Sequence, residues 1–362
     1  MLINTNFLCV SLKTELLQYL VCPTCKGQIL PNINKKVKNE IITGTLNCKN
    51  CKNIFPITEG IPRFVIDKTK NFVKTEDAFS AKWRTHHKNH QAKDWTEFQQ
   101  KWFLDRFGWK SIAQFNDFLK NKQYVLEAGT GVGNTAKILS VNPTSQVFAI
   151  DASESIDFAY KKYGKTSNLH FLQADLRELP FKMKFFDYIL SDQVLHHTKN
   201  TSTSFKYLTK FLTHKGHISI YVYNKKAPIR EYADDHIRKT TVNMSTKNCM
   251  EFSKNMAILG KSLSDLKKKI TVPHDIPILG IKSGTYDVQR FIYWHFLKCL
   301  WDPSNNFERS VGVNFDWYSP KYAYRHTPTE VKKWYEETKV KIIHFKEIES
   351  GISVTGIKKL SN

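Results

Sequence analysis

Four cysteines near the start of the chain have the residue type and spacing of a metal site. Cys22 and Cys25 form one C-x-x-C pair, and Cys48 and Cys51 form a second. A tight turn lets both thiolates of a pair face one point, and two turns complete a tetrahedron of sulfur around Zn²⁺. Four sulfur ligands leave no open coordination position, so we expect a structural zinc. The competing interpretation, one redox-active pair beside a chance pair, is disfavoured by the repeat of the motif.

A second candidate site follows the predicted buried strand Tyr124–Ala128. The turn after this strand contains three glycines, Gly129, Gly131 and Gly133. The third glycine comes one place too early for a dinucleotide fingerprint, and the Lys-Ser or Lys-Thr of a phosphate-binding P-loop is absent. Glu127 stands at the strand end, and its carboxylate suits a cationic ligand better than a pyrophosphate. A helix is predicted over Asn134–Leu139.

The next two predicted strands also end in carboxylates. Gln146–Ile150 leads into Asp151, where an acid can hold both hydroxyls of a ribose. Leu169–Gln173 leads into Asp175 and Leu176. The Asp175 carboxylate can accept from an adenine amino group, and Leu176 offers a backbone N–H. The pattern therefore indicates a nucleoside site without a phosphate subsite.

These motifs together resemble the class I S-adenosylmethionine-dependent methyltransferases. The patterns E-x-G-x-G-x-G, A-D-L-x-x-L-P-F and F-D-x-I-x-S-x-x-V-L-H-H occur in the order of that family. The resemblance implies an α/β, Rossmann-like, seven-stranded domain over residues 121–362, with S-adenosylmethionine as cofactor. It implies that Asp151 takes the ribose hydroxyls, that Asp175 and Leu176 contact the adenine, and that Ser191 forms the pocket floor. The methionine part is contacted by Glu127 and the three glycines. The full cofactor-binding set is Glu127, Gly129, Gly131, Gly133, Asp151, Ala152, Asp175, Leu176 and Ser191.

The activated methyl group of a sulfonium is transferred by in-line displacement, which requires alignment of the nucleophile and exclusion of water. A hydroxyl nucleophile also needs a general base, and histidine fits this role near neutral pH. His196 and His197 follow the fourth predicted strand and are the first candidates, with His326 in reserve. The alternative for the first pair is a structural hydrogen bond at a helix start.

The region around the cysteines carries a resemblance of its own. Two stretches are similar to the small Trm-type zinc-ribbon proteins that activate tRNA, rRNA and release-factor methyltransferases. They are LLQYLVCPTCKGQI and LNCKNCKNIFPITEGIPRFV. The similarity covers residues 12–66. It implies a zinc ribbon and a partner, or a fused partner, that uses S-adenosylmethionine.

Between the two units, residues 67–120 are predicted to form an aromatic, helical cap or linker. The spacing of Trp95, Phe98 and Trp102 is that of one helix face. These aromatics either cover the cofactor or pack only as core. A histidine group in the same region lacks a fourth ligand and is predicted to be exposed rather than metal-binding: His86, His87 and His90.

An insertion over residues 225–325 is predicted after the fifth strand, His217–Tyr223. Helices are expected at Asn248–Lys268 and Asp287–Trp301, where they cover the active site; a membrane-surface or partner role is the alternative. The stretches Asn314–Pro320 and Tyr322–Thr327 mix polar and aromatic groups. They are either substrate contacts or turn and cap residues. A helix at Pro328–Glu337 and two closing strands complete the predicted domain.

Composition limits the function classes. The chain has 362 residues, of which 41% are hydrophobic, and its net charge is +22. This charge could form a nucleic-acid-binding surface. Basic residues are spread along the chain, however, which favours a general compositional bias toward lysine and asparagine. No membrane span or signal peptide is expected, so a cytoplasmic location is predicted. Three cysteines outside the pairs are expected as core residues or surface thiols: Cys9, Cys249 and Cys299.

The sequence thus predicts an enzyme that methylates a hydroxyl or amino group of a small molecule, such as a secondary metabolite or a sugar-like compound. An RNA or protein methyltransferase is the first alternative, favoured by the charge and the ribbon. Enzymes that methylate adenine or glutamine amino groups usually carry Asn- or Asp-Pro-Pro-aromatic after the fourth strand, and this chain has Ser191-Asp192-Gln193-Val194 there. A non-catalytic scaffold that binds the cofactor is the second alternative. The oligomeric state is not predicted.

Overall fold

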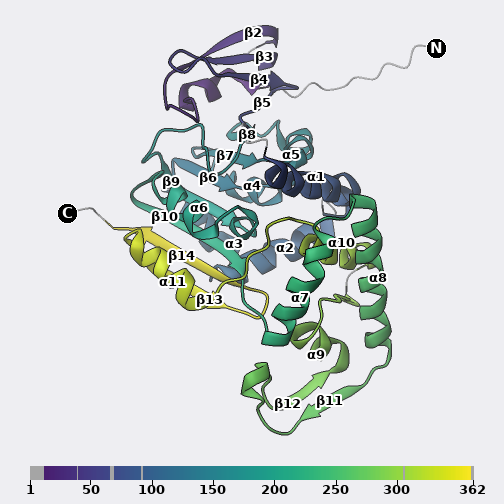
Figure 1. Cartoon of the computed structure of the whole chain (residues 1–362). Coiled ribbons are helices and arrows are strands. Elements are labelled where there is room, and N and C mark those ends of the chain that lie inside the picture. The colour runs from purple at the N-terminus through teal and green to yellow at the C-terminus, as the bar shows by residue number, and fades with distance from the viewer. Residues whose placement is uncertain (1–11, 39, 66–68, 91–92, 305, 360–362) are drawn as a thin grey trace.

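The computed structural model describes residues 12–38, 40–65, 69–90, 93–304 and 306–359, without the side chains of residues 70–72, 85–90 and 94–95. Five side chains discussed above lie outside this described part: Cys9, His86, His87, His90 and Trp95. Figure 1 shows three parts: a small sheet at the top, a central sheet between helices, and a helical region below.

A seven-stranded sheet forms the centre of the molecule. In chain order its strands are β6 (Tyr124–Ala128), β7 (Gln146–Asp151), β8 (Leu169–Gln173), β9 (Phe186–Asp192), β10 (Leu212–Tyr223), β13 (Val340–Glu347) and β14 (Gly351–Lys358). Their order across the sheet is β13-β14-β10-β9-β6-β7-β8. The strands are parallel except β14, which runs antiparallel to both β10 and β13. This arrangement confirms the predicted α/β, Rossmann-like, seven-stranded fold.

Successive side chains along a strand point to opposite faces of the sheet, and here both sets are apolar, so helices cover both faces. Val125 belongs to the hydrophobic core on one face of β6, and Leu126 to the core on the other. The helices of the Val125 side are α3 (Ile112–Leu119), α4 (Asn134–Leu139) and α5 (Ser155–Tyr163). Those of the Leu126 side are α6 (Thr201–Thr209) and α11 (Pro328–Glu337). A parallel sheet covered on both faces needs continuous apolar strands, as observed here.

The N-terminal unit is a small antiparallel sheet with the cysteines at its turns. Its elements are β1 (Leu12–Lys13), the short 3₁₀ helix η1 (Thr14–Tyr19), β2 (Ile29–Val37), β3 (Glu40–Cys48), β4 (Ile54–Thr58) and β5 (Ile61–Pro62). β3 is its central strand and pairs with β1, β2 and β4. Figure 1 places this unit beside the β8 edge of the large sheet.

The two units share one hydrophobic core. Leu16 and Phe64 of the small unit belong to the same buried cluster as Phe148 of β7. The Phe64 N–H donates to the Gln173 carbonyl at 2.7 Å, and the guanidinium of Arg63 holds both carboxylate oxygens of Asp157 at 2.6 and 3.1 Å. The ribbon is therefore packed against the end of β8, the strand that leads to Asp175.

Two helices connect the units. α1 (Lys70–His90) and α2 (Lys93–Arg106) confirm the predicted helical region. α1 lies against α5, where the Glu154 N–H donates to the Ser80 hydroxyl at 3.2 Å, and it also contacts α10. α1 thus spans from the sheet domain to the helical region.

The helical region follows β10, as predicted. Its elements are α7 (Pro228–Thr241), α8 (Thr246–Asp265), β11 (Lys269–Val272), η3 (Pro277–Leu279), β12 (Gly284–Asp287), α9 (Val288–His295) and α10 (Phe307–Tyr318). The expected helix Asp287–Trp301 ends early, at His295. α7, α10 and the β11–β12 hairpin were not expected, and most of Asn314–Pro320 lies in α10 rather than in a turn.

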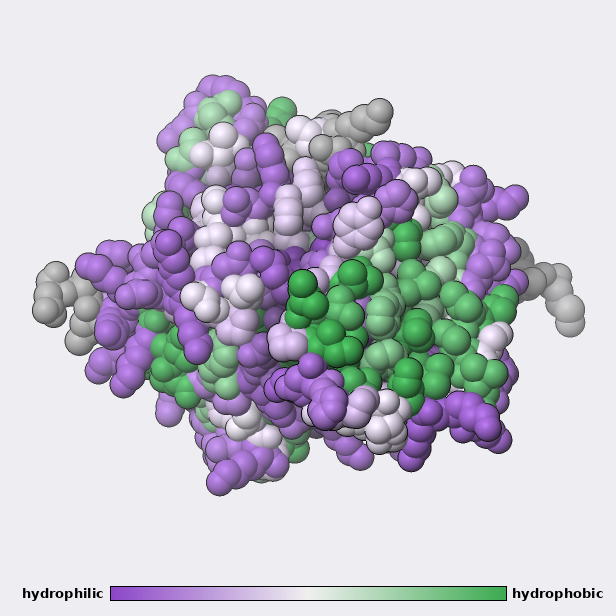
Figure 2. All heavy atoms as spheres, turned by 60° about the horizontal axis from the view of Figure 1, so that its bottom comes forward, coloured by the Kyte–Doolittle hydropathy of each residue, from purple (hydrophilic) through white to green (hydrophobic). Residues whose placement is uncertain are grey.

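One face of the insertion is apolar. Figure 2, in which the bottom of Figure 1 comes forward, shows hydrophobic residues gathered over this region. The exposed side chains that the insertion contributes include Ile270, Ile276 and Ile278. Among the described residues, none of the helices combines the length and the hydropathy that crossing a bilayer would require.

Candidate active site

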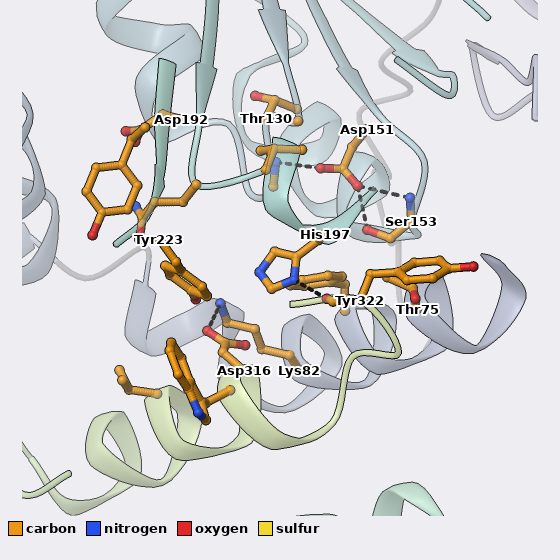
Figure 3. Close-up of a pocket in the computed structure, with 18 of the residues that line it drawn as sticks. Thr75, Lys82, Thr130, Asp151, Ser153, Asp192, His197, Tyr223, Asp316 and Tyr322 are labelled. Carbon is orange, nitrogen blue, oxygen red and sulfur yellow. Dashed lines mark hydrogen bonds and ion pairs between the residues drawn. The ribbon is translucent and has the colours of Figure 1, made fainter. Parts of the chain in front are cut away.

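One cavity of about 460 Å³ lies at the carboxyl ends of the central strands. Its walls come from the strand ends of β6, β7 and β9, from α1 and α2, and from the insertion. Figure 3 shows Asp151 and Thr130 on one side, and Tyr223, Lys82 and Asp316 on the other. Ligands of doubly wound sheets bind outside the carboxyl ends of the strands, at the point where the strand order reverses. We call the Asp151 side the donor end and the insertion side the acceptor end.

The glycine turn after β6 forms the floor of the donor end. Gly129 has a φ of +95°, and a Cβ there would lie 2.2 Å from a methyl carbon of Val194. The Gly131 N–H donates to Asp151 at 2.9 Å, so the turn folds toward the end of β7. Gly131 also has little room, because a Cβ there would lie 3.1 Å from the Trp83 ring. Both positions keep the backbone open to the cavity.

Glu127 lies in the wall below this turn and is 3% exposed. Its carboxylate accepts from the Thr130 hydroxyl at 2.5 Å. Burial raises the pKa of Glu127 to about 8, and the neighbouring Asp192 and Asp151 add to the rise. A ligand ammonium group beside Glu127 would favour its charged form and lower that pKa.

Asp151 and Ala152 line the cavity at the end of β7. One oxygen of Asp151 accepts from the Ser153 N–H at 2.9 Å and from the Ser153 hydroxyl at 2.6 Å (Figure 3). The other oxygen accepts from Gly131. The carboxylate is thus held in place by its neighbours.

Asp175 and Leu176 line the cavity after β8. Asp175 is 5% exposed, and its carboxylate accepts from the Arg177 Nε at 3.0 and 2.9 Å. An amino group that binds Asp175 would share this carboxylate with Arg177. Arg177 also lines the cavity and was not predicted from the sequence.

Two predicted cofactor residues lie behind the wall. Gly133 is the N-cap of α4 with a φ of +81°, and a Cβ there would lie 2.9 Å from Ala159 of α5. Ser191 is fully buried and donates to the Ala128 carbonyl at 3.0 Å. The first permits close packing of two helices, and the second joins the ends of β9 and β6.

The three candidate histidines occupy different positions. His197 lines the cavity, and its Nδ1 lies 2.7 Å from the Tyr322 carbonyl (Figure 3). A carbonyl only accepts, so Nδ1 carries the proton and Nε2 keeps a free lone pair. Burial lowers the pKa of His197 to about 3, so this ring is neutral at physiological pH.

His196 and His326 pack behind this wall. His196 is fully buried, its ring centroid lies 3.7 Å from that of Tyr223, and burial lowers its pKa well below the usual value. His326 has Nε2 3.0 Å from the Thr201 hydroxyl and packs edge-on against Trp334, and burial lowers its pKa to about 4. The rings of His196 and His197 lie 4.3 Å apart between centroids, but of the three histidines only His197 lines the cavity.

Two buried ion pairs of the cavity region were missed by sequence reasoning. Lys82 of α1 meets Asp316 of α10 at 2.6 Å, and Figure 3 shows them beneath Tyr223. Arg106 of α2 meets Asp192 of β9 at 2.7 Å, with its guanidinium carbon 3.6 Å from the centroid of the Trp102 ring. Burial raises the pKa of Asp192 although Arg106 opposes this. Each pair joins elements far apart in sequence, so no local motif could have indicated it.

The four cysteines of the ribbon form the predicted metal site. Their sulfur atoms all lie within 4.8 Å of one another. Two of the Sγ–Sγ distances, Cys22 to Cys51 and Cys25 to Cys48, are 3.5 Å. A tetrahedron with Zn–S bonds of about 2.3 Å has sulfur atoms about 3.8 Å apart, so the donor set fits zinc. The backbone N–H groups of Asn50 and Cys51 point at the Cys48 sulfur and orient it.

Comparison with known proteins gives matches to two family models, two similar protein sequences and a set of similar structures. A family model described as a methyltransferase domain matches residues 126–220, and one described as Trm112p-like protein matches residues 13–60. A UPF0434 protein of Methylobacillus flagellatus is 38% identical over 63 residues, which cover 17% of this chain and 92% of that protein. A UPF0434 protein of Shewanella denitrificans is 46% identical over 48 residues, 13% of this chain and 71% of that protein.

Among solved structures, the complex of the Haloferax volcanii Trm112 methyltransferase activator with a protein described as a methyltransferase is similar at a TM-score of 0.44. The identity is 13%, and the match covers 80% of this chain and 99% of that one. Magnesium protoporphyrin IX methyltransferase of Synechocystis PCC 6803 is similar at a TM-score of 0.43 and 14% identity, covering 80% of this chain and all of that one.

Proposed function

The chain belongs to the S-adenosylmethionine-dependent methyltransferases and carries a Trm112p-like zinc ribbon at its N-terminus, and on this premise we propose that it methylates a hydroxyl or amino group of a small molecule. One observation supports the proposal that the methyl acceptor is a small molecule. The cavity continues from the donor end to a wall of buried side chains contributed by the insertion, including Tyr293, Lys298 and Trp317. A small molecule fits such a covered space better than a folded RNA does.

We propose that the donor end holds the cofactor through three carboxylates. Glu127 would meet the ammonium group of the methionine part, and Asp151 the ribose hydroxyls. Asp175 would accept from the adenine amino group, while the Leu176 backbone faces the ring. The bound cofactor supplies an activated methyl group. The role of the carboxylates is to fix its direction toward the acceptor end, since in-line transfer depends on this alignment.

We propose that His197 handles the proton of a hydroxyl acceptor. Its Nδ1–H is fixed by the Tyr322 carbonyl, which leaves the Nε2 lone pair free to accept. A pKa of about 3 makes His197 a weak base, so its main contribution would be to orient the hydroxyl until the proton is lost. We assign His196 and His326 the structural task of supporting this wall.

The test is to follow the methyl group. Protein with bound zinc is first titrated calorimetrically with S-adenosylmethionine. It is then incubated with cofactor labelled in the methyl group and with three separate acceptor pools: metabolites below about 3 kDa, total RNA and total protein. We expect release of S-adenosylhomocysteine and label in the small-molecule pool. Label confined to RNA would instead support the alternative that the +22 net charge suggests. Absence of cofactor binding would refute the proposal.

We also propose that the protein works in the cytoplasm. Its zinc site needs four thiolates, and Cys249 and Cys299 are buried as free thiols. Reducing compartments preserve such groups. Fractionation of cells that express a tagged chain would test this, and recovery of the tag in an exported fraction would contradict it.

A further inference from the structure

The acceptor end contains three basic side chains, of which only one forms an ion pair in the described part of the chain. Lys226, Arg230 and Lys298 all line the cavity there. Arg230 is fully buried, and Lys298 is 5% exposed. Burying a positive charge is costly unless a negative group accompanies it. The negative groups near these three residues therefore need to be counted.

Arg230 has one carboxylate partner and an unused donor. Its Nε lies 2.7 Å from Asp234, which is also fully buried, and another guanidinium nitrogen donates to the Tyr293 carbonyl. The remaining nitrogen, Nη2, is buried without a hydrogen-bond partner among the described residues. An unsatisfied buried N–H of this kind costs about 1–3 kcal/mol, and more where the group is charged, so a ligand oxygen that reaches it stabilises the site.

The two lysines rely on uncharged oxygens. Lys298 donates to the Tyr293 hydroxyl at 2.9 Å. Lys226 donates to three backbone carbonyls, those of Asn224 at 2.9 Å, Ser350 at 3.2 Å and Glu349. Within the described part of the chain, neither lysine forms an ion pair with a carboxylate. In the described part of the chain, the pair of Arg230 with Asp234 is therefore the one ion pair that these three residues form.

Two further acids of α7 are held by other groups. Glu231 and Asp235 both bind Arg325, at 2.9 and 2.5 Å, and Glu231 also accepts from the Lys226 backbone N–H at 2.8 Å. Of the acids of the insertion that line the cavity, Asp316 pairs with Lys82. The effect of the excess positive charge is visible in two pKa values. Burial lowers the pKa of Lys226 to about 7, and Arg230 and Lys298 add to the decrease. Burial favours neutral Tyr293, yet Lys298 and Arg230 outweigh it and lower the pKa of that phenol.

Aromatic rings flank the three cations. The guanidinium carbon of Arg230 lies 5.1 Å from the centroid of the Tyr293 ring and 5.4 Å from that of Trp317. Lys298 is 5.0 Å from the same Trp317 ring, and Lys226 is 5.6 Å from the ring of Trp294. All three rings line the cavity. Flat walls beside basic groups suit a planar molecule that carries an acidic substituent.

We propose that the acceptor end is an anion subsite: the methyl acceptor is an aromatic or other planar molecule with a carboxylate or phosphate group, which binds Lys226, Arg230 and Lys298. This inference rests on the proposed function, because it names the class of molecule that the same cavity methylates. The acidic group is held at the insertion. The atom to be methylated then points back toward the donor end.

The experiment compares three probes of similar shape. Protein saturated with S-adenosylhomocysteine is titrated calorimetrically with 4-hydroxybenzoate, phenyl phosphate and the neutral 4-hydroxybenzamide. We expect at least one anion to bind about tenfold more tightly than the amide, and the stronger of the two identifies carboxylate or phosphate as the preferred group. In Lys298→Met and Lys226→Met, we expect this preference to fall below about threefold.

Exposed Lys269 in β11 provides the matched control, since Lys269→Met removes the same charge away from the cavity and should leave the preference unchanged. Lys226 is only half-buried, so Lys226→Met decides the question if Lys298→Met does not fold. Equal binding of amide and anions, absence of binding by both anions, or a preference that survives the Lys226→Met change would each overturn the subsite. Affinity for S-adenosylhomocysteine is measured in the same samples. If it is intact while the anion preference is absent, the subsite fails and the proposed function stands.

Discussion

The two ends of the cavity are built in different ways. At the donor end, each important group follows directly from a strand of the sheet: Glu127 and the glycine turn from β6, Asp151 from β7 and Asp175 from β8. At the acceptor end, the groups come from α1 and from helices and loops of the insertion, and they meet across long stretches of chain. Lys82 and Asp316, for example, form a buried pair between α1 and α10. The fold fixes the first end by strand register, whereas the second depends on how separate helices pack.

This difference suits an enzyme with one constant and one variable ligand. Parallel strands keep their carboxyl ends at a fixed spacing of about 4.8 Å, so acids placed there hold a constant relative geometry. The helices of an insertion can change their side chains without disturbing that register. We therefore expect changes at the donor end to affect cofactor binding strongly, and changes near the acceptor end to leave it largely intact.

The largest expected effect tests the glycine turn. In Gly129→Val the new side chain would collide with Val194 and would require a positive φ, so we expect affinity for S-adenosylmethionine to fall by at least about a hundredfold in calorimetric titration. Gly284→Val is the control, because Gly284 also has a positive φ but lies in the exposed hairpin of the insertion. Equal losses in both variants would mean that backbone strain, and not obstruction of the donor end, is responsible.

A smaller effect is expected from pH. Glu127 has a pKa of about 8 in the free protein, and the ammonium group of the cofactor favours its ionised form. Below pH 8, binding of the cofactor therefore releases a proton from Glu127. The affinity for the cofactor should rise about tenfold from pH 6 to pH 7 and level off near pH 8. Calorimetry in buffers of different ionisation enthalpy would detect that proton. In Glu127→Gln the rise should disappear; a rise that persists would assign it to another group.

The smallest effects are expected from the histidines. His197→Ala should reduce turnover by about tenfold without changing cofactor affinity, because only the acceptor hydroxyl loses a contact. His326→Ala should change turnover by less than about twofold and should mainly lower the melting temperature, since His326 packs against Trp334 behind the wall. Initial rates with the acceptor found in the small-molecule pool would measure both. A larger loss in His326→Ala than in His197→Ala would reverse our assignment of the two rings.

The contrast between the two ends also explains what could be predicted from the sequence. The bounds of α4, β8 and α11 agree with the predictions, because caps, glycine turns and apolar runs are local signals. Glu127 and Asp151 were predicted as cofactor contacts from similar local signals. Both line the cavity, and their contact with a cofactor stays a prediction.

α10 shows where this reasoning fails. Its buried face contains Asn314 beside Phe315 and Tyr318, so polar and aromatic residues alternate without a clean apolar stripe. Asn314 is buried because its side chain pairs with the backbone of Leu300 at 2.9 and 3.1 Å. This partner exists only in the folded chain. The ion pairs Lys82–Asp316 and Arg106–Asp192 were missed for the same reason.

The joint between ribbon and sheet has a consequence for how such an enzyme is regulated. Where activator and enzyme are separate chains, a cell can set activity through the ratio of the two. Here ribbon and sheet belong to one chain and are always present in equal amount, and Leu16 and Phe64 are buried in the same core as Phe148. We therefore expect loss of zinc to be felt beyond the ribbon, at the packing of the edge strand β8.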